Sequence, residues 1–529
     1  MGVPVLAIPP RRSMAFFATL AILMTIVSYI FLLALAVACV YFPFRLLESG
    51  VTNLQVVLLF FFGIAVAGAL LWSMVPRRDK FSPPGPRLER ASQPRLFAEL
   101  DRIADLLGQP VPRDVYLIGD MNAYVADRGG VMGLGSHRIM GLGLPLLSVL
   151  TIPQFRAVLA HEFAHFYGGD TRLGPWVYKA RKSLIQTFEH MGSLSALVRF
   201  AVLQLMYVLV THILKWYFLF FLRITSLISR RQEFRADELA CIVAGPAPLI
   251  DGLRTIQSTG PVWPTYWNTE VSPLLSNGTL PSIGDGFARF VAAPSIAGQI
   301  DKLLAEKLEY EEVQPYDTHP PLRERIWAAE KLPAAEAQDT ETLPALTLLE
   351  HREALELHLV MTVNPKLAME SLTRVEWDDI VSKSTIPSWT KSVTTYFRLM
   401  QGFTVERLPE AVATLAQMGP QIRDPQGTLL NPQQRMARAA DLLAMALGLA
   451  LHREVWTLQV QPGTRFLKKD SLALNPFQIV SQLANKEMTA EAWRTLCRNL
   501  GIGQLSLVPP DVHHPAVSTS EVESPAPSF

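Results

Sequence analysis

Two histidines and a glutamate stand close together in the sequence, at His161, Glu162 and His165. On a helix, residues i and i+4 project from one face, so both imidazoles can reach one Zn²⁺ ion at about 2.0–2.1 Å. Glu162 lies beside this pair, where it can take a proton from a metal-bound water and later deliver it to a leaving amine. The spacing favours the chemistry of a zinc hydrolase. The alternative is a salt-bridged helix with two polar histidines.

A third metal ligand has to come from elsewhere in the chain. The longer metzincin motif would need a histidine where this chain has Thr171, so that class is excluded. Glu233 and Asp237 are also spaced i and i+4, on what we expect to be a second helix. Glu233 can complete a His₂Glu ligand set, and Asp237 can accept a hydrogen bond from a ligating imidazole and fix its tautomer. Taken alone, the pair also fits an exposed, charged helix turn.

These motifs resemble a known family. The pattern H-E-x-x-H at 161–165 followed by E-x-x-x-D at 233–237 is similar to the membrane zinc endopeptidases that include HtpX and the Ste-type CAAX prenyl protease. Further agreement lies in the lead to the first motif, the aspartate after it, an N-A-[FY]-x strand and a T-H-P-P-x-x-x-R signature: Ala157–Ala160, Asp170, Asn122–Val125 and Thr318–Arg325. The resemblance covers about Pro94 to Ile326.

The resemblance implies a gluzincin-like zinc peptidase domain and a role for each matching residue. His161, His165 and Glu233 would bind one Zn²⁺ ion per chain, and Glu162 would be the general base. Asp237 would support one of the ligating imidazoles. The prenyl-protease activity known in the family does not carry over, because no feature of the sequence distinguishes a chamber for prenylated peptides.

The other two motifs imply roles in substrate binding and support. Asn122, Ala123 and Tyr124 would lie on a strand that pairs with an extended substrate backbone, which suits a peptide and loose sequence specificity. His319 would either donate to the developing oxyanion or be structural, since His-Pro-Pro begins a helix. Arg325 would be structural and would buttress the fold.

The elements that must position these residues begin with membrane spans. Apolar residues make up 49% of the chain's 529 residues and charged residues 18%, with a mean hydropathy of +0.22. Ser13–Phe44 and Ser49–Pro76 contain no charged residue, and each exceeds the ~20 apolar residues that cross a bilayer. The sequence predicts two transmembrane helices, at about 14–42 and 54–75, in a hairpin formed by residues 1–80.

Most positive charges lie at the two outer ends of the hairpin. Arg11 and Arg12 precede the first span, and Arg77, Arg78 and Lys80 follow the second. The connector holds only Arg45 and Glu48. The positive-inside rule therefore places both ends in the cytoplasm. We expect an integral membrane protein, of the bacterial inner membrane, with its catalytic site on the cytoplasmic side. An export signal at Arg11-Arg12 or a lipoprotein site at Ala36–Cys39 is the alternative, but either leaves the second apolar run unexplained.

A third apolar stretch, Leu197–Ile228, lies between the two halves of the metal site. Because His165 and Glu233 have to meet on one side of the membrane, the chain between them crosses an even number of times or not at all. The stretch is too short for two spans of ~20 residues, and a single crossing is excluded. We expect a short membrane-inserted hairpin, a helix along the interface or a re-entrant segment, whereas HtpX-like relatives usually show two clear spans.

The whole chain is predicted to be mainly α with a small β-sheet: an α-helical membrane protein with a gluzincin-like zinc peptidase domain and a helical C-terminal region. Beyond the hairpin we expect the peptidase domain at 81–335, a helical C-terminal domain at 336–507 and a disordered tail at 508–529. A net charge of +1 provides no basic field for nucleic acid, and three separated cysteines provide no disulfide framework or cysteine metal site.

These patterns predict a membrane-bound zinc metalloendopeptidase, acting in membrane-protein quality control or processing. Its expected partners are a peptide or membrane-protein substrate, the lipid bilayer and a protein contacted through the helical C-terminal domain. The alternative is a membrane-tethered scaffold or interaction protein whose peptidase fold is catalytically silent or secondary. The intact Glu162 argues against a silent fold, because an inactive descendant need not keep the base.

Overall fold

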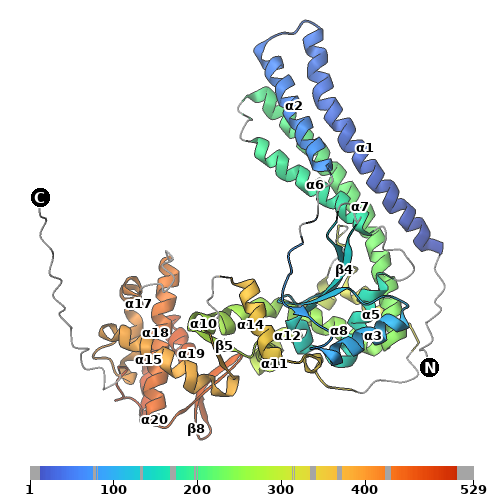
Figure 1. Ribbon diagram of the computed structural model, residues 1–529. Helices are drawn as coiled ribbons and strands as arrows, with labels where there is room; N and C mark the ends of the chain where they lie inside the picture. Colours follow the sequence, from blue (N-terminus) through green and yellow to red (C-terminus); the bar gives the residue numbers. More distant parts are fainter. Residues whose placement is uncertain are drawn as a thin grey trace, which may run out of the picture. The chain divides into compact units, whose positions relative to one another are not determined.

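The computed structural model describes residues 12–75, 79, 81–130, 135–166, 174–195, 198, 200–311, 314, 316–333, 341–365, 372–422 and 431–508. Helices dominate this part of the chain, with small sheets between them (Figure 1), which confirms the predicted fold class. The chain divides into two compact units. One contains Met1–Trp263 and Gly298–Leu367, and the other contains Pro264–Ala297 and Ala368–Phe529.

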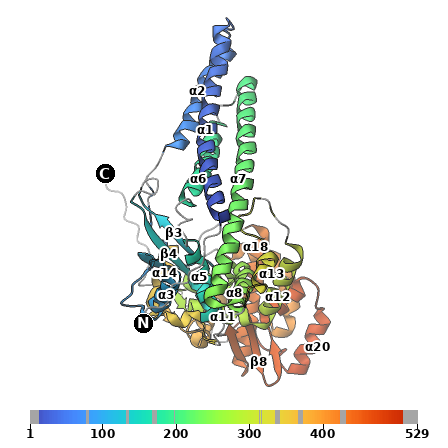
Figure 2. The same cartoon turned by 90° about the vertical axis from the view of Figure 1, so that its right-hand side faces the viewer.

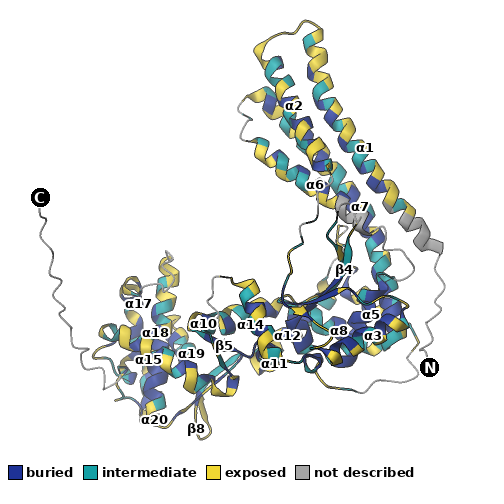
Figure 3. Cartoon of the chain, viewed as in Figure 1, coloured by how far each residue is buried: buried dark blue, intermediate teal, exposed yellow. Residues whose placement is uncertain are grey.

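Two antiparallel helices form the first membrane hairpin. Helix α1 (Arg12–Glu48) and helix α2 (Leu54–Met74) cover the two uncharged runs. The Asn53 side chain accepts a hydrogen bond from the backbone N–H of Val56 and so begins α2. Both helices carry many exposed residues on their outer faces (Figure 3), large apolar side chains among them, as expected of surfaces that meet lipid.

Helix α7 (Ala201–Ala244) is a single helix of 44 residues that contains most of the third apolar stretch. It runs beside α1 and continues down to the helices that carry the metal site (Figure 2). With Ile22–Glu48 and Leu54–Met74, it is one of three helices in the described part of the chain that are long and apolar enough to cross a membrane. Because no turn interrupts α7, the predicted short hairpin and re-entrant segment are wrong over the described residues, and the alternative of a helix along the interface stays a prediction.

A helix that hydropathy does not reveal accompanies α7. Helix α6 (Gly174–Leu194) packs against α1 and α2, and the chain returns through α7. Its Ser183 and Thr187 hydroxyls donate hydrogen bonds to Ser73 of α2, at 2.8 Å to the carbonyl oxygen and 2.8 Å to Oγ. Its outward face carries exposed Arg181 and Lys182. Those charges lower its mean hydropathy, which is why the sequence did not predict it as the partner of α7.

A four-stranded sheet lies in the same unit, in the order β1-β2-β4-β3. Its strands are β1 (Arg87–Leu88), β2 (Asp114–Ile118), β3 (Ala123–Arg128) and β4 (His137–Gly143). Strands β2 and β4 are parallel, while β3 pairs antiparallel with β4 and has no strand on its other side among the described residues. The chain leaves β3 through Gly129 and Gly130, whose φ angles of 82° and 71° suit glycine in a tight turn.

Further helices belong mainly to the same unit as this sheet. They are α3 (Pro94–Leu106), α4 (Leu144–Val149), α5 (Ile152–Ala164), α8 (Pro246–Thr259), α12 (Pro294–Tyr310), α13 (Leu322–Glu330) and α14 (Arg352–Val363). Helix α5 starts at a capping box in which Thr151 and Gln154 each bond to the other's backbone N–H. Its apolar face packs against the lower part of α7, where Ala164 meets Ala236 and Leu239. This contact brings the two halves of the metal site together.

The second unit combines an insertion from the middle of the chain with the C-terminal region. Its elements are α10 (Ser272–Ser276), β5 (Thr279–Pro281), α11 (Ile283–Ala292), β6 (Thr373–Val375), α15 (Ile386–Thr395), α16 (Leu408–Ala413), α17 (Leu415–Met418), α18 (Pro432–Arg453), β7 (Thr457–Gln461), β8 (Thr464–Lys469), β9 (Leu472–Leu474), α19 (Pro476–Ala484) and α20 (Ala490–Leu500). The short α9 (Trp263–Tyr266) lies at the boundary.

The insertion joins the C-terminal residues through a strand pair and an aromatic contact. Strand β5 pairs in parallel with β6, and the indole N–H of Trp377 donates to the Ser282 carbonyl at 2.7 Å. The unit thus takes residues 264–297 from within the range expected for the peptidase domain. Its three-stranded sheet β7-β8-β9 was not predicted from the sequence. The tail expected to be disordered lies, from residue 509 onward, outside the described residues.

Candidate metal centre

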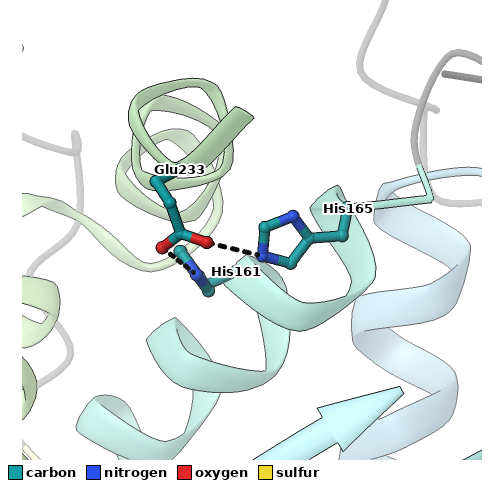
Figure 4. Close-up of side chains that lie close together, drawn as sticks. All are labelled: His161, His165 and Glu233. Carbon is teal, nitrogen blue, oxygen red and sulfur yellow. Dashed lines mark ion pairs between the residues drawn. The ribbon is translucent and has the colours of Figure 1, made fainter. Parts of the chain in front are cut away.

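Three side chains from two helices converge at the contact between α5 and α7 (Figure 4). His161 lies on α5, His165 caps the end of this helix one turn later, and Glu233 faces both from α7. The Nε2 atom of His161 is 3.5 Å from Oε2 of Glu233, and Nε2 of His165 is 3.6 Å from Oε1. One ligand atom from each residue lies within 4.8 Å of the others, so the three can hold one ion.

The geometry of these atoms fits zinc. Bonds of about 2.0–2.1 Å in a tetrahedron place neighbouring ligand atoms roughly 3.3 Å apart, close to the distances observed. Oε2 of Glu233 is buried and makes no hydrogen bond to the described residues, although a buried carboxylate oxygen normally has a partner. Two imidazoles and one carboxylate are also the donor set of catalytic zinc sites, which keep the fourth position open for water or substrate.

An aspartate and an arginine support the ligands from behind. Asp237 lies one turn after Glu233 on α7, and its Oδ1 is 3.0 Å from Nδ1 of His161. Arg325, in the first turn of α13, donates from Nε and Nη2 to both oxygens of Asp237, at 2.8 and 2.7 Å. Its Nη1 is 3.6 Å from Oε2 of Glu233. The contact at Nδ1 leaves Nε2 of His161 facing Glu233, which is the orientation that a metal ligand requires.

All of these charged groups are shielded from solvent. Arg325 and Asp237 are 6% and 2% exposed, so the pair depends on its two hydrogen bonds to offset the cost of burial. Burial and the charge of His161 lower the pKa of His165 to about 4, which keeps that imidazole neutral. Burial alone would lower the pKa of His161, but Asp237 and Glu233 outweigh it and raise the value to about 10. Metal binding has to displace a proton from His161.

Glu162 lies between the ligand pair and the edge strand β3. Burial raises the pKa of its carboxyl group to about 7, against smaller lowering effects that include a hydrogen bond to the backbone of Val125 on β3. Sequence reasoning selected Glu162 but missed this partner, because a backbone N–H leaves no signature in a side-chain pattern. The contact shows that β3 passes directly beside the expected general base.

The outward edge of β3 follows from its register. The backbone N–H of Gly143 donates to the carbonyl of Asn122 at 2.8 Å, and the antiparallel ladder alternates from there. Ala123, Val125 and Asp127 therefore direct their N–H and C=O groups away from β4. Ala123 and Tyr124 lie on this strand, as the resemblance implies, with Asn122 just before it. Their role in binding substrate stays a prediction.

His319 approaches the same centre from the loop before α13. Its Nε2 lies 3.7 Å from Oε1 of Glu233, and its side chain is 65% exposed. Arg230, on α7 just before Glu233, holds this loop by donating to the carbonyls of Gln314 and Asp317, the latter at 3.2 Å. Sequence reasoning missed this support, because it joins residues that are far apart in the chain. Asp170 lies outside the described residues.

The chain was also compared with known proteins. Residues 90–332 match the model of a protein family described as peptidase family M48. The matched range contains all four motifs on which the resemblance rested, from Asn122 to Arg325, and confirms it. Searches among curated proteins and among solved structures returned no match.

Proposed function

Residues 90–332 belong to peptidase family M48, the zinc metalloprotease family of HtpX and the Ste-type prenyl proteases, and from this premise we propose how the chain works as an endopeptidase. The family and the three apolar helices make the protein a membrane-associated zinc metallopeptidase. Its mechanism, substrate and orientation are the subject of the proposal. The observation that carries it is the convergence of His161, His165, Glu233 and Glu162 at one buried point.

We assign the metal to the three convergent side chains. His161, His165 and Glu233 hold Zn²⁺, which when bound lowers the pKa of a water ligand and polarises a carbonyl group. Asp237 keeps the proton of His161 on Nδ1, and Arg325 keeps Asp237 in place. Both act on the orientation of the ligands and do not touch the substrate.

Glu162 is the general base in this proposal. A buried carboxyl group with a pKa of about 7 can both accept and return a proton at neutral pH, which peptide hydrolysis needs in successive steps. The Val125 N–H steadies the carboxylate on the side of β3. We assign His319, whose Nε2 approaches Glu233 from the rim of the centre, the role of donating to the oxyanion of the tetrahedral intermediate.

The substrate is an extended peptide that adds to the free edge of β3. Ala123, Val125 and Asp127 offer backbone donors and acceptors there, and main-chain pairing is tolerant of sequence. Positive flanks of the first hairpin support a cytoplasmic active site in a bacterial inner membrane, with membrane proteins as substrates in processing or quality control. The second unit is proposed to contact a substrate or a partner protein.

The test is to separate zinc binding from catalysis. Glu162→Gln should retain about one zinc per chain and lose about 10²–10⁴-fold in kcat on a casein-like or peptide substrate. Glu238→Gln is the matched control, because Glu238 follows Asp237 but pairs with Arg235 at 2.7 Å. It should keep both zinc and activity.

Two outcomes would contradict the proposal. Full cleavage by Glu162→Gln would reject this residue as the base. Zinc binding by the wild-type protein without any peptide cleavage would favour the alternative, a membrane-tethered scaffold with a silent peptidase fold.

A further inference from the structure

The turn at the far end of β3 is fastened to the exit of the first membrane hairpin. The carboxylate of Asp79 accepts hydrogen bonds from Nε and Nη2 of Arg128, at 2.7 and 3.2 Å, and from the backbone N–H of Gly129 at 2.9 Å. The backbone N–H of Asp79 in turn donates to the carbonyl of Gly130 at 3.0 Å. We call Asp79, Arg128, Gly129 and Gly130 the strand clamp.

The strand clamp joins two functional parts of the molecule at one point. Asp79 follows the end of α2 at Met74 by five residues, so it lies at most roughly 18 Å from the end of the span. Arg128 is the last residue of β3. A part-buried ion pair alone adds modest stability, but here the backbone of the turn is bound on both its donor and acceptor sides. The clamp therefore fixes the position of one strand end.

The same strand leads from the clamp to the expected general base. Val125, whose backbone faces Glu162, precedes Arg128 by three residues, or about 10 Å of strand. The outward-facing positions Ala123, Val125 and Asp127 fill this interval. A chain that leaves the bilayer beside α2 and pairs with β3 thus reaches Glu162 within roughly eight extended residues.

From this geometry we infer that Asp79 is a positioning residue that fixes how far from the membrane the enzyme cleaves. The favoured substrate is an integral membrane protein with an extended segment directly after one of its spans. This inference rests on the proposed function, because it takes β3 as the substrate strand and Glu162 as the base. Asp79 itself touches neither substrate nor metal.

The experiment uses the full-length enzyme reconstituted in lipid vesicles with two forms of one cleavable sequence. In the first form it follows a single transmembrane helix, separated from it by 2, 8, 16 or 32 residues. In the second form it is a free soluble peptide. The enzyme variants are wild type, Asp79→Asn and Asp101→Asn. Asp101, on α3, forms a similar bidentate pair with Arg90, which precedes this helix, so Asp101 is the matched control.

We expect wild-type enzyme to cleave the anchored substrate best at the 8-residue spacing. Asp79→Asn should raise the KM for that substrate about 10-fold, which is about 1.4 kcal/mol, and flatten the dependence on spacing. It should change the KM for the soluble peptide by a much smaller factor. Asp101→Asn should leave the spacing profile as in wild type. Arg128→Lys, which keeps the charge but only part of the pairing, should fall between wild type and Asp79→Asn.

The inference is overturned if wild type shows no preferred spacing, or if Asp79→Asn affects anchored and soluble substrates equally. Zinc content and thermal melting identify a variant that has simply lost its fold, and in that case Arg128→Lys decides. A different result would show that the proposed function itself is wrong. In that case Glu162→Gln would cleave the soluble peptide as fast as wild type does.

Discussion

The two halves of helix α7 face opposite environments. The half nearer its start presents large apolar side chains outward, among them Leu205 and Trp216, which are 70% and 74% exposed. The half nearer its end buries two carboxylates, Glu233 and Asp237, at 7% and 2% exposure. Lipid can surround the exposed apolar side chains of the first half, and ion pairs stabilise the buried carboxylates of the second. A single continuous helix therefore carries both the membrane anchor and part of the metal centre.

This arrangement implies that the position of the helix in the membrane and the position of Glu233 are set together. Among the described residues no glycine or proline interrupts α7 before it ends at Gly245. Gly245 has a φ of 91°, a conformation that other residues rarely adopt, and there the chain turns into α8. A continuous helix transmits rotation along its length, and the following substitutions test this view.

The largest effect is expected from changing the phase between the two halves. One alanine inserted after Ser229 rotates the end of α7 by about 100° relative to the membrane half. Glu233 would leave the histidines, and we expect loss of bound zinc and of measurable peptide cleavage. An insertion of seven residues restores the phase to within about 20° and should retain more zinc than the single insertion does. Equal zinc loss in both proteins would show that length, and not rotation, is what matters.

Removing the support of the buried carboxylates should have the next largest effect. Arg325→Leu leaves Asp237 buried without its partner, and such a change costs about 3–5 kcal/mol of stability. We expect a lower thermal midpoint and weaker zinc binding, both measured on detergent-purified protein. Arg235→Leu is the comparison, because Arg235 forms its ion pair with Glu238, which is not one of the proposed metal ligands. A stable, zinc-loaded Arg325→Leu protein would remove Arg325 from this account.

The same substitution in each half tests the contrast directly. Leu239→Ala removes a side chain that is 0% exposed and packs against Ala164 of α5, at an expected cost of about 2–5 kcal/mol. Leu209→Ala removes one that is 57% exposed, and its cost should stay within about 0.5 kcal/mol. Unfolding in denaturant measures both. Similar costs for the two variants would contradict the division of α7 into a lipid-facing and a packed half.

The smallest effect concerns α6, the helix that accompanies α7. Thr187→Val removes the 2.8 Å hydrogen bond to Ser73 of α2, and bonds of this kind between membrane helices average about 0.6 kcal/mol. The expected shift in stability is small and should be accompanied by normal zinc content. Disulfide trapping of a cysteine pair at positions 73 and 187 provides a second test. Failure to cross-link would contradict the contact between α2 and α6.

Spacing in the sequence was enough to select two histidines and one glutamate as candidate site residues. His161, Glu162 and His165 share one helix, and local periodicity fixes which side chains share a face. Glu233 required the family resemblance as well, because its approach to α5 is a contact between residues far apart in sequence. Arg325 was selected as a structural residue, but its bonds to Asp237 depend on how α13 meets α7, which no local pattern encodes.

Other parts of the fold were harder to predict from the sequence. The charges of α6 concealed a helix that packs beside α2, because hydropathy averages over both faces. The insertion 264–297 carries Tyr266 and Phe287, whose rings pack together at 5.4 Å in the second unit. Its sequence indicated only prolines, glycines and scattered aromatics. The strand clamp consists of a single ion pair and backbone bonds at a turn, so its constituent residues carry no motif.

The account depends most on the identity of the metal ligands, and X-ray absorption at the zinc edge reads them directly. We predict about one zinc per chain, with two imidazole nitrogens and oxygen ligands at about 2.0–2.2 Å and no sulfur. Glu233→Ala should lower the zinc content well below one per chain. Sulfur ligands at about 2.3 Å, or an unchanged zinc spectrum and content in Glu233→Ala, would contradict the account.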